Sequence, residues 1–155
     1  MKSRKGNRSR LLSEHAGSGE RPGADIDNLM AEARSAMGRA YAPYSRFHVG
    51  AAVSTDLGVF AGANVENASY GLSICAERVA ASSAVAAGAR RIDALAVTSS
   101  SPNPASPCGA CRQFLYEFGP DMMVVSEGCD GSRREWRLSE LLLDAFGPSD
   151  LESAE

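Results

Sequence analysis

The sequence contains no apolar run approaching the roughly 18–20 residues that a membrane-spanning helix requires. Basic residues occur at the N-terminus, but no apolar core follows them, which argues against a secretory signal. No internal repeat is present, so a repeat architecture is not expected. With 155 residues, 44% of them hydrophobic and 23% charged, the chain has the composition of one ordinary globular domain. We therefore expect a single soluble domain, located in the cytoplasm.

Acidic residues are missing from the first ten positions, which contain five of the sixteen basic residues, namely Lys2, Arg4, Lys5, Arg8 and Arg10. The rest of the chain has eleven basic residues against nineteen acidic ones. A net-acidic body repels a phosphate backbone, so nucleic acid is not the expected partner, whereas a small uncharged substrate meets no such barrier. Residues 1–24 are rich in Arg, Lys, Ser and Gly without apolar periodicity, and we expect a disordered basic extension there.

Alternating helical and extended patterns follow from Asp25 onward. Apolar residues at helical spacing predict a helix near residues 26–37, and further helices are expected over 75–87 and 108–118, with a short one capped by Ser139. Extended patterns predict strands near residues 47–53, 59–65, 92–98, 122–125 and 135–138. The first of these strands alternates as if half-buried. This order predicts an α/β protein with three α/β/α layers around one mixed five-stranded sheet. The domain should span residues 25–148, followed by a flexible tail over 149–155.

Cysteine is scarce, but three of the four cysteines occur in a metal-binding pattern. Cys75 stands alone, and Cys108 and Cys111 form a C-x-x-C pair. Zinc with three protein ligands keeps a position for water, which is typical of catalytic sites. We therefore expect one Zn²⁺ per chain. The alternatives are disulfides, which the absence of a secretion signal disfavours, and a structural four-cysteine zinc site that includes Cys129. Cys129 lies alone in a polar turn, so we interpret it as a free thiol.

Two charged residues, Glu77 and Arg78, lie two and three positions after Cys75. Glu77 is close enough to reach water at the metal without binding the metal, and a non-ligand glutamate acting as general acid and base is a described feature of zinc deaminases. A carboxylate also suits the first turn of any helix, so Glu77 alone would not indicate catalysis. Three thiolates leave a zinc centre with one net negative charge. Arg78 is therefore expected to donate hydrogen bonds to the sulfur atoms.

A second polar pair ends the predicted strand over residues 59–65. In an extended segment Asn64 and Glu66 face the same side, so they present an amide and a carboxylate together. Such a pair suits a sugar hydroxyl, although both residue types are common at strand ends. Phe47 offers an aromatic face for a heterocycle, or is a plain core residue.

Four segments together resemble the small, homotetrameric cytidine deaminases: residues 41–52 (YAPYSRFHVGAA), 64–70 (NVENASY), 74–78 (ICAER) and 106–113 (SPCGACRQ). Cysteine at position 75, where other zinc deaminases have histidine, points to the all-cysteine branch. The resemblance runs from about residue 26 to residue 148. Asp144 occupies a position where the family often has proline, and the basic extension is longer than is usual in the family.

The resemblance implies several roles that spacing alone does not. It implies that Phe47 stacks on the pyrimidine, that Asn64 and Glu66 hold the ribose 3′-hydroxyl, and that the backbone around Cys75 and Ala76 reads the base edge. It further implies a homotetramer in which Tyr70 and Phe146 help to build a neighbouring subunit's site.

The implied activity is zinc-dependent deamination of cytidine and 2′-deoxycytidine to uridine and 2′-deoxyuridine, with a place in pyrimidine salvage. An aminonucleoside-antibiotic deaminase of the same fold is the nearest alternative. A polynucleotide deaminase fits the acidic body poorly. A zinc-stabilised binding protein without turnover is the alternative outside the enzymes.

Overall fold

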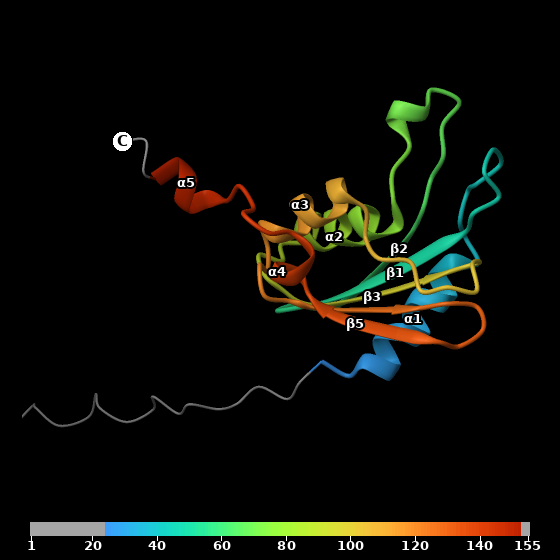
Figure 1. Ribbon diagram of the computed structural model, residues 1–155, viewed down its shortest axis with the longest axis horizontal. Helices are drawn as coiled ribbons and strands as arrows, with labels where there is room; N and C mark the ends of the chain where they lie inside the picture. Colours follow the sequence, from blue (N-terminus) through green and yellow to red (C-terminus); the bar gives the residue numbers. More distant parts are fainter. Residues whose placement is uncertain (1–23, 153–155) are drawn as a thin grey trace, which may run out of the picture.

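A computed structural model describes residues 24–152 of the chain. It has the expected three layers, with a mixed five-stranded sheet between helices (Figure 1). The basic extension and the last three residues, for which a disordered head and a flexible tail are predicted, lie outside the described residues. Within residues 24–152 no helix is long and apolar enough to cross a membrane.

The sheet has the strand order β2-β1-β3-β4-β5. Its strands are β1 (Val49–Thr55), β2 (Gly58–Ala63), β3 (Ile92–Ser99), β4 (Met123–Glu127) and β5 (Arg133–Arg137). Only β3 and β4 are parallel to each other; the other neighbouring pairs are antiparallel. Helices are α1 (Ile26–Met37), α2 (Ala76–Ala86), α3 (Gly109–Tyr116), α4 (Leu138–Leu141) and α5 (Pro148–Glu152), and a 3₁₀ turn, η1, covers Tyr70–Leu72.

Helices cover both faces of the sheet, α1 on one side and α2 and α3 on the other (Figure 1). Along β1, Ala52 packs in the cluster beneath α1, whereas Ala51 and Val53 belong to the cluster beneath α2. The expectation that this strand is half-buried was therefore wrong, because residues from Gly50 to Val53 are all buried. Gly50 and Gly62 permit the close helix packing: a Cβ atom would lie 2.0 Å from the Ala33 carbonyl oxygen at Gly50 and 2.5 Å from the Ala80 nitrogen at Gly62.

Two short helices near the C-terminus differ from expectation. Helix α4 begins at Leu138, not after Ser139, and Arg137 is its N-cap. The fully buried Leu138 fixes this start, and the Glu140 carboxylate accepts a hydrogen bond from the Arg137 backbone nitrogen at 2.8 Å. Helix α5 covers residues for which the sequence predicts a tail. The N-cap of α1 is Asp25, and its carboxylate accepts a hydrogen bond from the Asn28 nitrogen.

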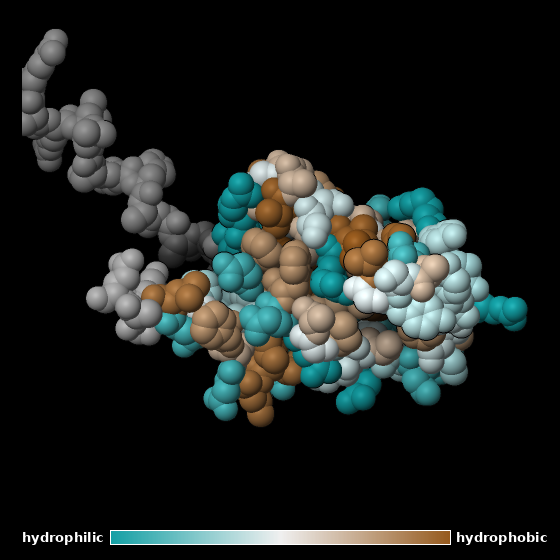
Figure 2. Space-filling model, turned by 90° about the horizontal axis from the view of Figure 1, so that it is seen from above, coloured by the Kyte–Doolittle hydropathy of each residue, from teal (hydrophilic) through white to brown (hydrophobic). Residues whose placement is uncertain are grey.

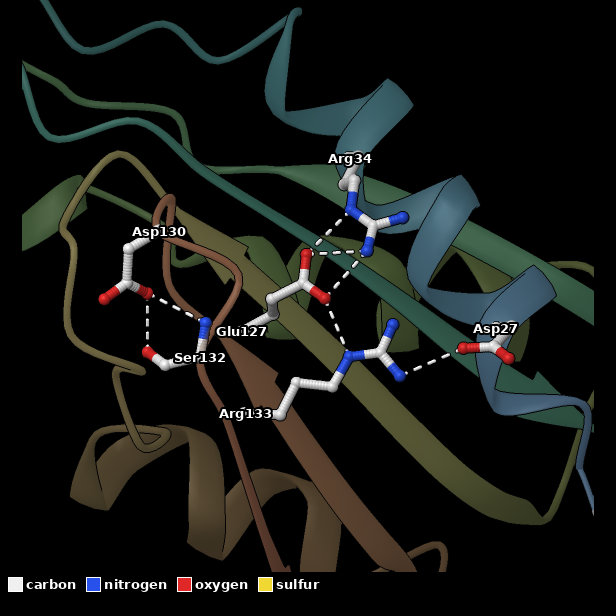
Figure 3. A network of polar contacts seen from close by, with 6 residues as sticks. All are labelled: Asp27, Arg34, Glu127, Asp130, Ser132 and Arg133. Atoms are coloured by element: carbon white, nitrogen blue, oxygen red, sulfur yellow. Dashed lines mark hydrogen bonds and ion pairs between the residues drawn. The ribbon is translucent and has the colours of Figure 1, made fainter.

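A network of charged residues joins α1 to the last residue of β4 and the first residue of β5 (Figure 3). Buried Glu127 accepts hydrogen bonds from Arg34 on α1, with both nitrogen–oxygen distances at 2.7 Å, and from Arg133 on β5 at 2.7 Å. Arg133 also bonds to Asp27 at 3.0 Å. We call these four residues the Glu127 network. They fix α1 against the sheet on the face opposite α2.

Candidate metal centre and nucleoside pocket

Two helix N-termini meet at the three predicted metal ligands. Cys75 is the N-cap residue of α2 and Cys108 that of α3, while Cys111 is buried in the first turn of α3. Their sulfur atoms all lie within 4.8 Å of one another, with 3.8 Å between those of Cys75 and Cys108. Unpaired backbone N–H groups and the helix dipoles favour negative charge at this place.

Of the three thiols, that of Cys75 is prepared for deprotonation. Hydrogen bonds from Cys111 and from the Arg78 guanidinium lower the pKa of Cys75 to about 5, against the effect of its partial burial. The same hydrogen bond with Cys75, together with burial, raises the pKa of Cys111. Negative charge therefore gathers on Cys75, and a divalent cation would take the place of the thiol protons. Three clustered, free thiols are soft donors that fit Zn²⁺.

Arg78 lies in the first turn of α2, next to the sulfur of Cys75. One of its terminal nitrogens is 3.6 Å from the Cys75 sulfur. Its Nε atom is buried and, among the described residues, has no hydrogen-bond partner. The exposed Cys129 is not a member of the three-cysteine group. Within residues 24–152 the geometry therefore brings together three candidate ligands and not four.

Glu77 follows in the first turn of α2 and is only 5% exposed. Burial raises the pKa of its carboxyl, and the negative charge at Cys75 adds to this effect. A carboxyl with a raised pKa binds a proton more readily than an ordinary carboxylate. Glu77 is therefore a buried carboxyl with a raised pKa beside the three cysteines.

A cavity of about 260 Å³ opens next to the cysteines and Glu77. Four of the predicted substrate-binding residues line it: Phe47, Asn64, Glu66 and Ala76. The ring of Phe47 belongs to an exposed loop and not to the core. A larger cavity, of about 730 Å³, lies at the other end of the sheet near Asp56 and Arg91, and no cysteine lines it.

Asn64 and Glu66 also have structural partners in the loop that carries Phe47. The Asn64 side chain accepts from the Val49 nitrogen at 2.9 Å and donates to the Phe47 carbonyl at 2.8 Å. The Glu66 carboxylate accepts from the backbone nitrogens of Tyr44 and Ser45 and from the Ser45 hydroxyl. The hydroxyl of Ser45 in turn accepts from the Phe47 nitrogen at 3.0 Å. Sequence reasoning assigned no role to Ser45, because a small polar residue in a loop gives no pattern.

Tyr70 and Phe146 do not line the 260 Å³ cavity. Tyr70 is 75% exposed on η1 and Phe146 is 59% exposed near the C-terminus. Tyr70 lines, together with Glu66, a second hollow of about 270 Å³. Neither aromatic residue therefore lines the cavity of its own chain beside the cysteines.

Comparison with known proteins agrees with this geometry. A sequence model of the cytidine and deoxycytidylate deaminase zinc-binding region matches residues 24–127. The chain is 46% identical to a cytidine deaminase of Halalkalibacterium halodurans over 129 residues, which cover 82% of this chain and 98% of the relative. It is 42% identical to a cytidine deaminase of Sporosarcina psychrophila, over 84% of this chain and 97% of the relative.

Solved structures give the same result. The crystal structure of a cytidine deaminase from Burkholderia pseudomallei is similar with a TM-score of 0.74 and 50% identity, covering 77% of this chain and 98% of the other. The corresponding structure from Mycobacterium tuberculosis gives a TM-score of 0.69 and 43% identity over 79% and 98% of the two chains. With its three-cysteine metal centre and a matching sequence model over most of its length, the chain belongs to the cytidine deaminase family.

Proposed function

We propose that this chain catalyses the hydrolytic deamination of cytidine and 2′-deoxycytidine, in which water replaces the amino group and ammonia leaves. The observation that carries this proposal is the buried Glu77 carboxyl, which adjoins three clustered thiols and lines a cavity of about 260 Å³. That cavity is slightly smaller than those typical of drug-sized ligands, which suits a nucleoside.

Cys75, Cys108 and Cys111 would hold the Zn²⁺ ion, which when bound lowers the pKa of water and supplies a nucleophile at neutral pH. Glu77 would take one proton from the attacking water and give it to the ring nitrogen of the pyrimidine. It would then take the second proton of the same oxygen and give it to the amino group, which leaves as ammonia. Arg78 donates to the Cys75 sulfur and so withdraws electron density from an electron-rich centre. Phe47, Asn64, Glu66 and the backbone at Ala76 orient the nucleoside.

A homotetramer with shared sites is part of the proposal. Large apolar side chains are exposed around η1 and near the C-terminus, among them Tyr70, Leu72, Ile74 and Phe146. Seen from above the α2 and α3 layer, hydrophobic side chains lie open at the surface between hydrophilic ones (Figure 2). Neighbouring subunits would cover these side chains, and Tyr70 and Phe146 would reach a partner's pocket. Mass measurement in solution, by light scattering, tests this assembly.

Four free cysteines suit a reducing compartment, so we place the enzyme in the cytoplasm, where it would serve pyrimidine salvage. The test of the activity is ammonia release from cytidine, compared with cytosine, cytidine monophosphate and a single-stranded oligonucleotide, with zinc measured on the same sample. Turnover of the nucleosides alone, with one zinc per chain, supports the proposal. Zinc without turnover of any of the four compounds would favour the antibiotic-type deaminase or the binding protein.

Replacing Glu77, the proposed general acid and base, distinguishes an enzyme from a binding protein without turnover. Glu77→Gln should keep zinc and the fold, and should lose roughly 10²- to 10⁴-fold in kcat, the usual contribution of general acid–base catalysis. Retained activity in this variant would contradict the role given to Glu77.

A further inference from the structure

Cys108 is the least secured of the three metal ligands. Cys111 is fully buried within α3, and the Cys75 sulfur is fixed by the Arg78 guanidinium. Cys108 is exposed, and like Cys75 it precedes its helix in extended backbone (φ −66°, ψ 164°) without a side-chain capping bond. Unlike Cys75, it has no arginine among the described residues that donates to its sulfur, which lies 3.8 Å from the Cys75 sulfur. The position of its sulfur therefore depends on the turn formed by Ala105, Ser106 and Pro107.

Arg112 lies in α3, and its side chain donates hydrogen bonds to the segment of Ala105, Ser106 and Pro107. Its Nε atom donates to the Pro107 carbonyl at 2.7 Å, and one terminal nitrogen donates to the Ser106 hydroxyl at 2.9 Å. Its backbone nitrogen donates to the Cys108 carbonyl at 3.0 Å. Arg112 thus bonds to Cys108 itself and to both residues before it. The turn has one further attachment, from the Ser126 hydroxyl on β4 to the Ala105 carbonyl at 2.8 Å.

The same guanidinium also reaches the C-terminal segment. Its other terminal nitrogen donates to the carbonyl of Leu141, the last residue of α4, at 2.7 Å. The next residue, Gln113, donates to the Phe146 carbonyl at 2.7 Å. Helix α3 therefore carries one candidate metal ligand, Cys111, follows directly on another, Cys108, and also binds the segment that leads to Phe146.

We propose that Arg112 is a positioning residue for the metal centre, which fixes the turn of Cys108 and ties it to the C-terminal segment at Leu141. The guanidinium donates to three uncharged oxygen atoms, which are the Ser106 hydroxyl and the carbonyls of Pro107 and Leu141. These atoms belong to two separate segments of the chain. A planar guanidinium with five donors spans them, whereas the compact ammonium of lysine would not. The inference rests on zinc binding by the three cysteines, which is part of the proposed function, but not on which nucleoside is deaminated.

The test compares zinc release from Arg112→Met, Arg112→Lys and Ser106→Ala with that from the wild type, using the zinc-loaded protein and excess colorimetric chelator. Loss of an interaction that orients a metal ligand typically costs roughly 10- to 100-fold in metal affinity or activity. We expect release from Arg112→Met to be faster by roughly that factor, with Arg112→Lys between it and the wild type. In cobalt-substituted protein, the visible absorption bands of Arg112→Met should shift, because the ligand geometry at Cys108 changes.

Arg90 provides the matched control. Its guanidinium also donates to backbone carbonyls, those of Val85 at 3.1 Å and Ala89 at 2.8 Å, at the end of α2 remote from the cysteines. Arg90→Met should lower thermal stability without changing zinc release or the cobalt spectrum. Equal release rates from Arg112→Met and Arg90→Met at matched stability would overturn the proposal.

Two further results distinguish a failure of this inference from a failure of folding or of the proposed function. If Arg112→Met does not fold, Ser106→Ala decides, because it removes one contact without stranding a charge; unchanged zinc release in that variant overturns the role of Arg112. If the wild type itself binds no zinc, both this inference and the proposed function fail. Normal zinc release in the Arg112 variants, with wild-type zinc intact, removes only the inference.

Discussion

Replacing Arg34 should destabilise the protein in a pH-dependent manner, because Arg34 supplies two of the three hydrogen bonds from arginine that the Glu127 carboxylate accepts in Figure 3. Glu127 is 8% exposed at its side chain, whereas Arg34 is 46% exposed and Arg133 35%. The carboxylate is therefore the desolvated partner. In Arg34→Met it would keep only Arg133.

The expected loss lies between two known limits. Exposed ion pairs contribute about 0.2–1 kcal/mol, and removing one partner of a buried pair costs about 3–5 kcal/mol. Because water replaces part of the Arg34 contact and Arg133 stays, we expect about 1.5 kcal/mol. For a domain of this size that corresponds to a drop in Tm of roughly 4–6 °C. The free energy of unfolding is measured by urea titration.

The pH dependence has a definite sign. Burial alone would raise the pKa of Glu127, but the hydrogen bonds from Arg133 and Arg34 outweigh it and hold the pKa below its ordinary value of 4.5. A carboxyl with a lowered pKa in the folded state stabilises the protein above its unfolded-state pKa, and this stabilisation is lost as the pH falls through the folded-state value. The difference between wild type and Arg34→Met should therefore be full at neutral pH and shrink below about pH 4.5.

An exposed ion pair provides the control for Arg34→Met. Arg91 and Asp93 form a pair in which both side chains are more than 40% exposed, so Arg91→Met should change stability by less than about 0.5 kcal/mol. Acid also weakens thiolate–metal bonds, but the Glu127 network lies on the opposite face of the sheet, so this loss is common to wild type and variants. A difference that stays constant or grows in acid would refute the reasoning.

Three other substitutions test separate parts of the structure. Ser45→Ala breaks the link between Glu66 and the Phe47 backbone, so KM for cytidine should rise several-fold with kcat little changed, as steady-state kinetics would reveal. Cys129→Ser should leave one zinc per chain by metal analysis, and zinc loss would instead favour a four-cysteine site. Gly62→Ala places a Cβ atom 2.5 Å from the Ala80 nitrogen and should cost roughly 1–3 kcal/mol in urea unfolding.

Sequence patterns predicted the elements and the metal centre well, for physical reasons. Helical periodicity over residues 26–37 predicted α1, which the Asp25 cap begins and whose buried residues include Leu29, Met30 and Ala33. The lone Cys75 caps α2, the C-x-x-C pair spans the start of α3, and these two helix N-termini, which both favour negative charge, come together in the fold. The three-cysteine group could therefore be predicted before any coordinates were known.

Long-range hydrogen bonds could not be predicted in this way. Arg112 meets Leu141 across 29 positions, and Arg34 meets Glu127 across 93, and neither pair has a periodicity or spacing that would indicate it. The start of α4 was also missed, because burial of Leu138 against the sheet outweighed the capping preference of Ser139. Tertiary packing decided each of these features, and local propensity did not.

Asn64 and Glu66 make structural contacts that a motif alone does not reveal. Each side chain already holds the loop of Phe47, Asn64 through two backbone groups and Glu66 through three donors from Tyr44 and Ser45. A carboxylate has about four acceptor sites and an amide has a second N–H, so both retain capacity for a sugar hydroxyl. Substituting either residue would therefore disturb the loop and the proposed ribose contact together. Ser45→Ala perturbs the loop alone, and the difference between its KM and that of Glu66→Gln isolates the contribution of the hydroxyl contact.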